Sequence, residues 1–403
     1  MRITMLCVNF APRRCARNGG ELRFWQNASS LLALGHKLTL LVPADRVQDL
    51  DLQADGTALE IIPTKIQRPA EGRWNSYRLA LLSMLSNRAA LRYFLRIDPE
   101  SLTTALRQVE REPNQLVWAE WVGGMWAAVP FKRVLYSHTD FLHKVINVRY
   151  QTKRRRITLR ERLRLRRLQR AELALSDRAQ AVICVSAAEA VELTARRTDV
   201  TYIPIVGPTI RRPEANAEPV ARVFLFGTGA NTAMRRALAF LREELWPRLG
   251  EVRNRVEWHS VGEPDGLDVG GNWTWMVQHF KSHGFVEDLS RVFRPGDGLL
   301  MPYPENTGFR TRFVTAAAYG VVAVGLQSTF SCAPEFKNEL NCLVAQDTAG
   351  LVRQLERFSS DRTLRSRLGR AAMELYRREF SFEAQLPKYR LVLERLTESD
   401  GRK

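Results

Sequence analysis

The segment GLLMPYPENTGFRTRFVTAAAYGVVAVG, residues 298–325, contains a complete strand, loop, helix and second strand. The apolar run 298–303 predicts a buried strand, and the β-branched run 321–325 predicts another. The alanine-rich stretch between them predicts a helix. Two strands joined by a crossover helix pair in parallel, because antiparallel neighbours need only a short turn. The segment therefore predicts an α/β fold built on a parallel sheet.

The same alternation of strand and helix runs through the rest of the chain. Pro208, Pro213 and Pro219 interrupt it once, and we expect a linker there. The pattern predicts two Rossmann-like doubly wound domains facing a cleft, with ligands outside the carboxyl ends of the strands. The predicted strands are 2–8, 36–43, 58–63, 115–121, 133–140, 181–186, 221–227, 255–262, 298–303, 321–325 and 341–346. The predicted helices are 21–35, 76–95, 99–111, 231–249, 272–280, the one after Gly308, and three from Thr348 onward.

Composition narrows the class of partner. The chain has 403 residues and a net charge of +18, and only nine of its 61 basic residues are lysines. Guanidinium groups bind phosphate in a bidentate manner, which favours nucleotide diphosphates, anionic lipid headgroups or nucleic acid. No apolar run reaches the ~18–20 residues of a membrane span, and the N-terminus does not resemble a signal peptide. We therefore expect a cytoplasmic protein. Its five cysteines show no zinc-type spacing, so we expect no metal.

Arg310 and Arg312 stand where the helix of the opening segment begins. The first N–H groups of a helix are unpaired and carry partial positive charge, so cations there are unfavourable unless an anion lies between them. Both arginines are therefore predicted phosphate ligands, and Gly308 permits close approach of the backbone. Solvated surface arginines are the alternative.

Five segments of the C-terminal half resemble the large glycosyltransferase family 4-like group of retaining GT-B enzymes, also called group 1 glycosyl transferases. In order along the chain they are FGTGANTAMRRALAFLREELWPRL (226–249), HSVGEPD (259–265), HGFVEDL (283–289), GFRTRFVTAAAYGVVAVG (308–325) and APEFKNELNCLVAQD (333–347). The N-terminal half resembles the group more loosely, through NGGELRFWQNASSLLALGHKLTLLVP (18–43), VLYSHTD (134–140) and RAELALSDRAQAVICVSAAEAVEL (170–193).

The resemblance implies a division of labour between the domains. Residues 1–207 would bind the acceptor, 208–219 would be the linker, 220–380 would bind the nucleotide-sugar, and a helix over 381–403 would cross back to the first domain. The implied reaction transfers a sugar from a nucleotide-diphosphate-sugar, as substrate and not cofactor, with retention and without a metal. The implied acceptor is a glycan, a lipid-linked saccharide or a small molecule.

The resemblance also assigns candidate site residues. His138, at a strand end, Arg310 and Glu305 would be catalytic, with Glu305 reaching a donor-sugar hydroxyl. The donor-binding residues would be Gly19, Gly20, Gly227, Gly229, Phe285, Val286, Thr307, Gly308, Phe309, Arg312 and Thr315. Gly19 and Gly20 would offer backbone amides to the phosphates. A structural, hydrogen-bonded His138 and a solvent-facing Glu305 are the alternatives.

One departure concerns the ribose. Thr315 stands where the family carries a glutamate that holds the ribose hydroxyls, and Thr307 stands near the position of another carboxylate. A carboxylate accepts from both hydroxyls, whereas a threonine has one hydroxyl. A catalytically impaired relative acting as a binding or scaffold protein is therefore the alternative function.

Residues 151–170 contain ten basic side chains. Arg156, Arg160, Arg164 and Arg167 share one face of a predicted helix, opposite an apolar stripe. A basic amphipathic helix is typical of a peripheral element on an anionic membrane. A solvated face over the domain core is the alternative, and nucleic acid is disfavoured because no aromatic residues are interleaved with the arginines.

Overall fold

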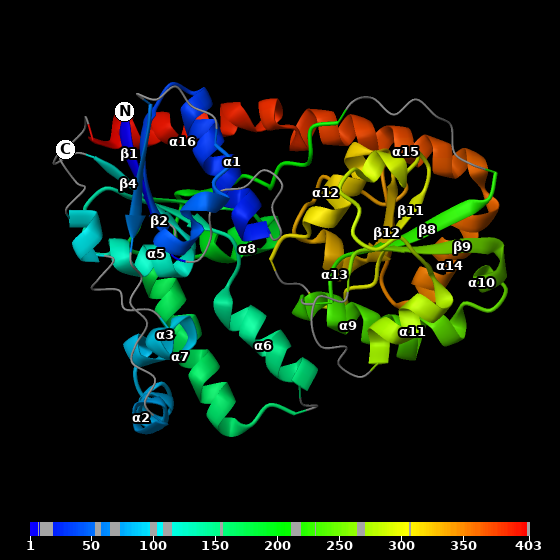
Figure 1. The fold of residues 1–403 in the computed structure, drawn as a ribbon, viewed down its shortest axis with the longest axis horizontal. Coiled ribbons are helices and arrows are strands. Elements are labelled where there is room, and N and C mark those ends of the chain that lie inside the picture. The colour runs from blue at the N-terminus through cyan, green and yellow to red at the C-terminus, as the bar shows by residue number, and fades with distance from the viewer. Residues whose placement is uncertain are drawn as a thin grey trace. The chain divides into compact units, whose positions relative to one another are not determined.

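The computed structural model describes residues 1–6, 8, 19–52, 58–64, 73–96, 103–107, 115–153, 156–210, 219–229, 231–263, 271–305 and 308–400. The chain divides into two compact units, each containing one sheet and its covering helices (Figure 1). Unit 1 comprises Met1–Ile205, Thr307–Phe309 and Gln385–Lys403, and unit 2 comprises Val206–Asn306 and Arg310–Ala384.

Unit 1 contains a seven-stranded parallel sheet in the order β3-β2-β1-β4-β5-β6-β7. Its strands are β1 Arg2–Leu6, β2 Lys37–Pro43, β3 Leu59–Thr64, β4 Leu116–Glu120, β5 Val134–His138, β6 Ala181–Cys184 and β7 Val200–Tyr202. The strand order reverses between β1 and β4, as in doubly wound folds. The edge strand β7 was not among the predicted strands, because three half-buried residues carry almost no periodicity.

The helices of unit 1 are α1 Gly19–Ala33, α2 Arg73–Leu82, α3 Asn87–Leu95, α5 Trp121–Ala128, α6 Leu142–Lys153, α7 Leu159–Ser176, α8 Ala187–Thr194 and most of α16 Phe382–Asp400, with the 3-10 helix η1 Ala44–Asp49. The single helix predicted over 76–95 is wrong. The Ser86 hydroxyl accepts the N–H of Ala89 and begins α3 as a separate helix.

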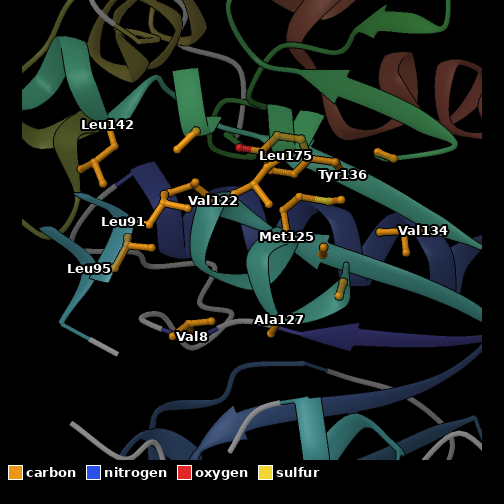
Figure 2. Close-up of a cluster of buried hydrophobic side chains, with 14 of the residues drawn as sticks. Val8, Leu91, Leu95, Val122, Met125, Ala127, Val134, Tyr136, Leu142 and Leu175 are labelled. Atoms are coloured by element: carbon orange, nitrogen blue, oxygen red, sulfur yellow. The ribbon is translucent and has the colours of Figure 1, made fainter. Parts of the chain in front are cut away.

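Side chains alternate between two apolar cores on the two faces of the unit 1 sheet. One core joins the strands to α3, α5, α6, α7 and α8. Figure 2 shows part of it, with Leu91 and Leu95 of α3, Val122 and Met125 of α5, and Leu175 of α7. The other core joins the strands to α1 and to the last helix, α16.

In the second core, Ile3 and Trp118 of the strands share one buried cluster with Tyr389, Val392 and Leu396 of α16. The ring centroids of Trp118 and Tyr389 lie 6.2 Å apart in a stacked arrangement. The C-terminal helix is thus an integral layer of unit 1, although it begins 376 residues after the end of β1.

Helix α7 carries most of the basic face predicted for residues 151–170. The helix begins after Thr158, whose side chain and Glu161 form a reciprocal capping box, so Arg156 lies outside it. Arg164 Nε donates to the Ala80 carbonyl at 3.1 Å, and Arg167 Nε donates to the Met84 carbonyl at 3.3 Å. These two arginines therefore pack against α2 and the turn that follows it. Arg156 and Arg160, the other two residues of the predicted face, are exposed.

Unit 2 contains a six-stranded parallel sheet in the order β10-β9-β8-β11-β12-β13. Its strands are β8 Ala221–Phe226, β9 Val256–Val261, β10 Lys281–Ser282, β11 Gly298–Met301, β12 Val322–Leu326 and β13 Leu343–Ala345. Its helices are α9 Thr232–Phe240, α10 Val252–Arg255, α11 Asn272–His279, α12 Thr311–Ala318, α13 Gln327–Phe330, α14 Thr348–Ser360 and α15 Arg362–Leu375, with short π or 3-10 turns at η2 Leu241–Leu245, η3 Trp246–Arg248, η5 Leu289–Arg291 and η6 Tyr376–Phe380.

The predicted α/β class with two Rossmann-like parallel sheets is confirmed in both units. Most of the predicted linker, residues 211–218, lies outside the described residues. Its first residues belong to unit 2, where the Tyr376 hydroxyl donates to the Pro208 carbonyl at 2.5 Å. Within the described ranges, no helix combines the length and apolar character needed to cross a membrane.

Candidate functional site

The strand order of unit 2 reverses between β8 and β11. At such a point the helices after the two strands lie on opposite faces of the sheet, leaving a crevice at the carboxyl ends. Gly227 follows β8 directly, and Tyr303 lies two residues beyond β11. Both positions predicted for donor phosphates, Arg310 and Arg312, come to this same edge.

Arg312 lies in the first turn of α12 and is fixed by its neighbours. Its guanidinium donates to the Tyr303 hydroxyl and lies 5.7 Å from the centre of the Tyr303 ring. Met234 Sδ, from α9, lies 3.9 Å from Arg312 Nη1. Arg312 is thus held between Tyr303, just beyond β11, and Met234, in the helix that follows β8.

Arg310 is the N-cap residue of α12, and its own side chain makes no capping hydrogen bond. Its guanidinium lies 4.8 Å from the centre of the Tyr303 ring, and Nη2 donates to the Glu305 carbonyl at 3.4 Å. Burial lowers the pKa of Arg310, since desolvation disfavours its charged form. An anion at the uncapped helix end would therefore be stabilised by two guanidinium groups and by the backbone N–H groups of the first turn.

Glu305, predicted to reach a donor-sugar hydroxyl, is held by an arginine of α9. Its carboxylate accepts from Arg236 Nε of α9 at 2.7 Å, in a pair that is partly shielded from solvent. The adjacent Arg235 donates to the Gly229 carbonyl at 2.7 Å and shapes the loop after β8. Sequence reasoning missed both α9 arginines, although the Arg-Arg pair in the first turns of a helix after a glycine loop was a visible signal.

Glycines line the same edge beyond β8. The Gly227 N–H donates to the Val261 carbonyl at 2.9 Å, and the Gly262 N–H donates to the Gly284 carbonyl at 2.7 Å. A Cβ on Gly262, at φ +126°, would meet the Gly227 carbonyl oxygen at 1.9 Å. Only glycine allows these backbones to pack so closely.

The remaining predicted donor-binding residues are spread around this edge. Phe285, just past Gly284, is 71% exposed, and Val286 is half-buried. Thr315 is half-buried midway along α12. Gly308, at φ +57°, and Phe309 group with unit 1, and Thr307 lies outside the described residues.

In unit 1, His138 ends β5 and is buried. Its Nε2 lies 3.0 Å from Glu189 Oε2 of α8, and its Nδ1 lies 3.1 Å from the Tyr136 hydroxyl. Burial raises the pKa of Glu189, but the hydrogen bond and charge of His138 and the ammonium of Lys144 outweigh it and hold that pKa below its usual value. Both ring nitrogens thus have protein partners, and a sugar hydroxyl would have to displace one of them.

His138, Cys184 and Glu189 are also the right residue types for a metal, and their ligand atoms lie within 4.8 Å of one another. Two observations speak against that use. The histidine and the carboxylate are already hydrogen-bonded to each other, and burial raises the pKa of the Cys184 thiol, which disfavours the thiolate that binds metal. The cluster fits a hydrogen-bonded network better than a metal centre.

A second buried network lies at the carboxyl end of β4 and was not predicted. Glu120 Oε1 accepts from Asn27 at 2.5 Å and from Trp118 Nε1 at 2.8 Å. The Tyr389 hydroxyl donates to Asn27 Oδ1. Burial raises the pKa of Glu120 to about 7, although Asn27 and Arg23 act in the opposite direction. Nothing in the local sequence of Glu120 distinguishes it, because Asn27 lies 93 positions away and Tyr389, the partner of Asn27, lies 362 positions beyond Asn27.

Gly19 and Gly20 are the first two residues of α1, where the sequence had suggested a loop. Their N–H groups therefore belong to a helix N-terminus, which is itself suited to an anion. The neighbouring Arg13, Arg14 and Arg17 lie outside the described residues.

No family model and no curated protein matches the chain. Solved structures do match over nearly the whole length. Sucrose-phosphate synthase from Thermosynechococcus elongatus is 16% identical with a TM-score of 0.68, and the match covers 99% of both chains. HepE of Anabaena, solved with UDP and glucose, is 13% identical with a TM-score of 0.59, covering 98% of this chain and 99% of that one. The trehalose-6-phosphate synthase OtsA is 11% identical with a TM-score of 0.60, covering 97% and 99%.

Identities this low establish the architecture and nothing finer. The two sheets, their reversed strand orders and the full-length matches agree with one another. The chain therefore has the GT-B fold.

Proposed function

We propose that this protein is a glycosyltransferase that takes a sugar from a nucleotide-diphosphate-sugar. One observation carries the proposal: Arg310, Arg312 and the uncapped start of α12 gather around Tyr303 at the strand-order reversal of unit 2. That arrangement suits a diphosphate better than a neutral ligand, because every group in it favours negative charge. The structural neighbour HepE was solved with UDP and glucose, which supports a nucleotide-sugar as the donor.

The chemistry follows from the charge that develops on the leaving group. As the bond between the anomeric carbon and the phosphate oxygen breaks, negative charge grows on the diphosphate. Arg310, Arg312 and the α12 N–H groups would stabilise the transition state, where this charge develops, more than they stabilise the ground state. This difference lowers the barrier. The acceptor hydroxyl would attack the same face of the sugar and give its proton to the departing phosphate oxygen, so configuration would be retained. No metal is needed for this charge balance.

The acceptor would bind in unit 1 and would be a glycan, a lipid-linked saccharide or a small molecule. His138 belongs to that unit, and its hydrogen bond to Glu189 makes it a positioned group. We propose that it orients a sugar hydroxyl after exchanging one of its present partners.

A thermal-shift screen with UDP, GDP and dTDP tests the donor site, because a ligand that binds only the folded state raises the unfolding midpoint. We expect one nucleotide to stabilise the wild type, and the Arg310→Ala/Arg312→Ala variant to lose that shift. Arg291→Ala is the matched control, since its side chain is 82% exposed on the same unit. Equal shifts for all three proteins would refute the diphosphate site.

A binding protein without turnover is the second candidate. Thr315 replaces the expected ribose-binding carboxylate, and Glu305 is engaged by Arg236. A donor-hydrolysis assay with the nucleotide-sugars of the stabilising nucleotide separates the two. Nucleotide binding with no sugar released, with or without glycan acceptors, would favour the binding protein.

A further inference from the structure

A group of large apolar side chains is exposed on α2 and on the turn after it. Tyr77 is 72% exposed, Leu81 58% and Leu85 70%, and their spacing of four residues places them along one side of the chain. Leu82 is exposed beside them. At the start of α7, Leu159 is 73% exposed and Leu163 is also exposed. We call these six residues the α2 tip.

The α2 tip is one surface because α2 and α7 are fastened together. Arg164 and Arg167 donate to carbonyls of Ala80 and Met84, which alternate with the exposed leucines. Arg164 also lies 5.1 Å from the centre of the Tyr93 ring of α3. Figure 1 shows α2 and the first turns of α7 at the same end of unit 1. The contacts between α2 and α7 thus fix the positions of the exposed apolar residues.

The charge on α2, on α3 and on the first turns of α7 is mostly positive. Residues 73–96 contain five arginines and no acidic residue. Residues 156–170 contain one acidic residue, Glu161, and its carboxylate is engaged by Thr158 in the capping box. The arginines at exposed positions on these elements are Arg78, Arg88, Arg92, Arg96, Arg156, Arg160, Arg162, Arg166 and Arg170.

A hollow of about 730 Å³ lies beside α3 and α7, and Asn87, two residues after Leu85 in the chain, is one of its lining residues. Leu91, Ala171 and Leu175 supply apolar lining, and Arg88, Arg107 and Arg178 supply cations. None of the described residues that line it is acidic. An apolar lining with cationic groups is suited to an amphipathic anion, such as a lipid with its phosphate.

We propose that the α2 tip docks this protein on an anionic lipid bilayer, with the leucines and Tyr77 entering the headgroup region and the arginines facing lipid phosphates. Apolar insertion and cationic attraction add together at such an interface. A second copy of the chain fits less well, because its arginines would meet arginines of the same sign. Nucleic acid fits less well, because exposed leucines gain nothing from a phosphate backbone.

Co-sedimentation of the full chain with vesicles tests the proposal. We expect binding to phosphatidylcholine vesicles that contain phosphatidylglycerol, weak binding to phosphatidylcholine alone, and loss of affinity as salt rises. Leu81→Ser/Leu85→Ser should weaken binding about a hundredfold, since two leucines no longer leave water. Val191→Ser/Leu340→Ser is the matched control, because those residues are 72% and 56% exposed elsewhere.

Unchanged thermal unfolding midpoints would show that both variants are folded, as expected for exposed positions. Three results would overturn the proposal: no binding of wild type to the anionic vesicles, equal binding by the two double variants, or a dimer in light scattering that only Leu81→Ser/Leu85→Ser dissolves. Each readout is independent of sugar transfer and of nucleotide binding.

Discussion

The guanidinium of Arg312 lies directly against the α-carbon of Gly227. A Cβ built on Gly227 would stand 2.5 Å from Arg312 Cζ, closer than non-bonded atoms approach. The residue after β8 and the first turn of α12 are therefore coupled, although 85 positions separate them in the chain. The orientation of Arg312, the predicted phosphate ligand, therefore depends on residue 227 having no side chain.

Gly227→Ala should displace Arg312 and weaken nucleotide diphosphate binding about tenfold, the loss expected for one charge-assisted contact. Isothermal titration with the stabilising nucleotide measures the change. Gly250→Ala is the control for backbone strain, because Gly250 also has a positive φ, of +51°, but has no atom within 4 Å of an added Cβ. Equal affinities in the two variants would show that Arg312 does not touch the phosphate.

Thr315→Glu should tighten nucleotide diphosphate binding about tenfold, because a carboxylate accepts from both ribose hydroxyls at charge-assisted strength. The gain should disappear with the 2′,3′-dideoxy nucleotide and should be smaller in Thr315→Gln. A gain that persists with the dideoxy nucleotide would place the ribose elsewhere.

Glu189→Gln should lower the free energy of unfolding by about 2–4 kcal/mol at pH 7, because the buried His138 loses its charged partner. The folded pKa of Glu189 lies below its usual value, so its contribution is full above the ordinary carboxyl range and is lost as pH falls through the folded pKa. Urea unfolding at pH 7 and below pH 4 should show the difference shrinking. Glu192→Gln, at a partly exposed partner of Lys144, should cost less than about 1 kcal/mol.

Glu120→Gln should reduce the loss of stability that the wild type shows as pH rises. The folded pKa of Glu120 is raised to about 7, so the folded state binds a proton more tightly than the unfolded state. Its effect is therefore a loss of stability as pH rises from about 4.5 to about 7, amounting to roughly 3 kcal/mol. The glutamine keeps an oxygen for Asn27 and Trp118, and unfolding curves at pH 5 and pH 8 should differ less in the variant than in the wild type. An unchanged difference would place the ionisation elsewhere.

Much of this fold could be predicted from the sequence, because buried parallel strands appear as β-branched runs and their crossover helices as amphipathic segments. The location of Arg310 and Arg312 could be predicted for the same reason, since a strand, a glycine loop and a helix start are local signals. The break between α2 and α3 rests on one serine cap and was missed.

The partners of the site residues could not be predicted. Arg236 meets Glu305 across 69 residues, and His138 meets Glu189 across 51. No local pattern marks such pairs, because only the packing of distant elements brings them together. The Arg164 and Arg167 contacts have the same origin, and they tie two of the four arginines of the predicted face to α2 and the turn after it.

The position of α16 has a consequence for how this protein is made. Tyr389, Val392 and Leu396 belong to the same buried cluster as Ile3. The core around β1 is therefore incomplete until α16 has been synthesised. Domains usually fold in order as they leave the ribosome. Here the apolar face that α1 and the strands offer to α16 stays uncovered while unit 2 is still being translated, and nascent unit 1 is the natural client for a chaperone during that interval.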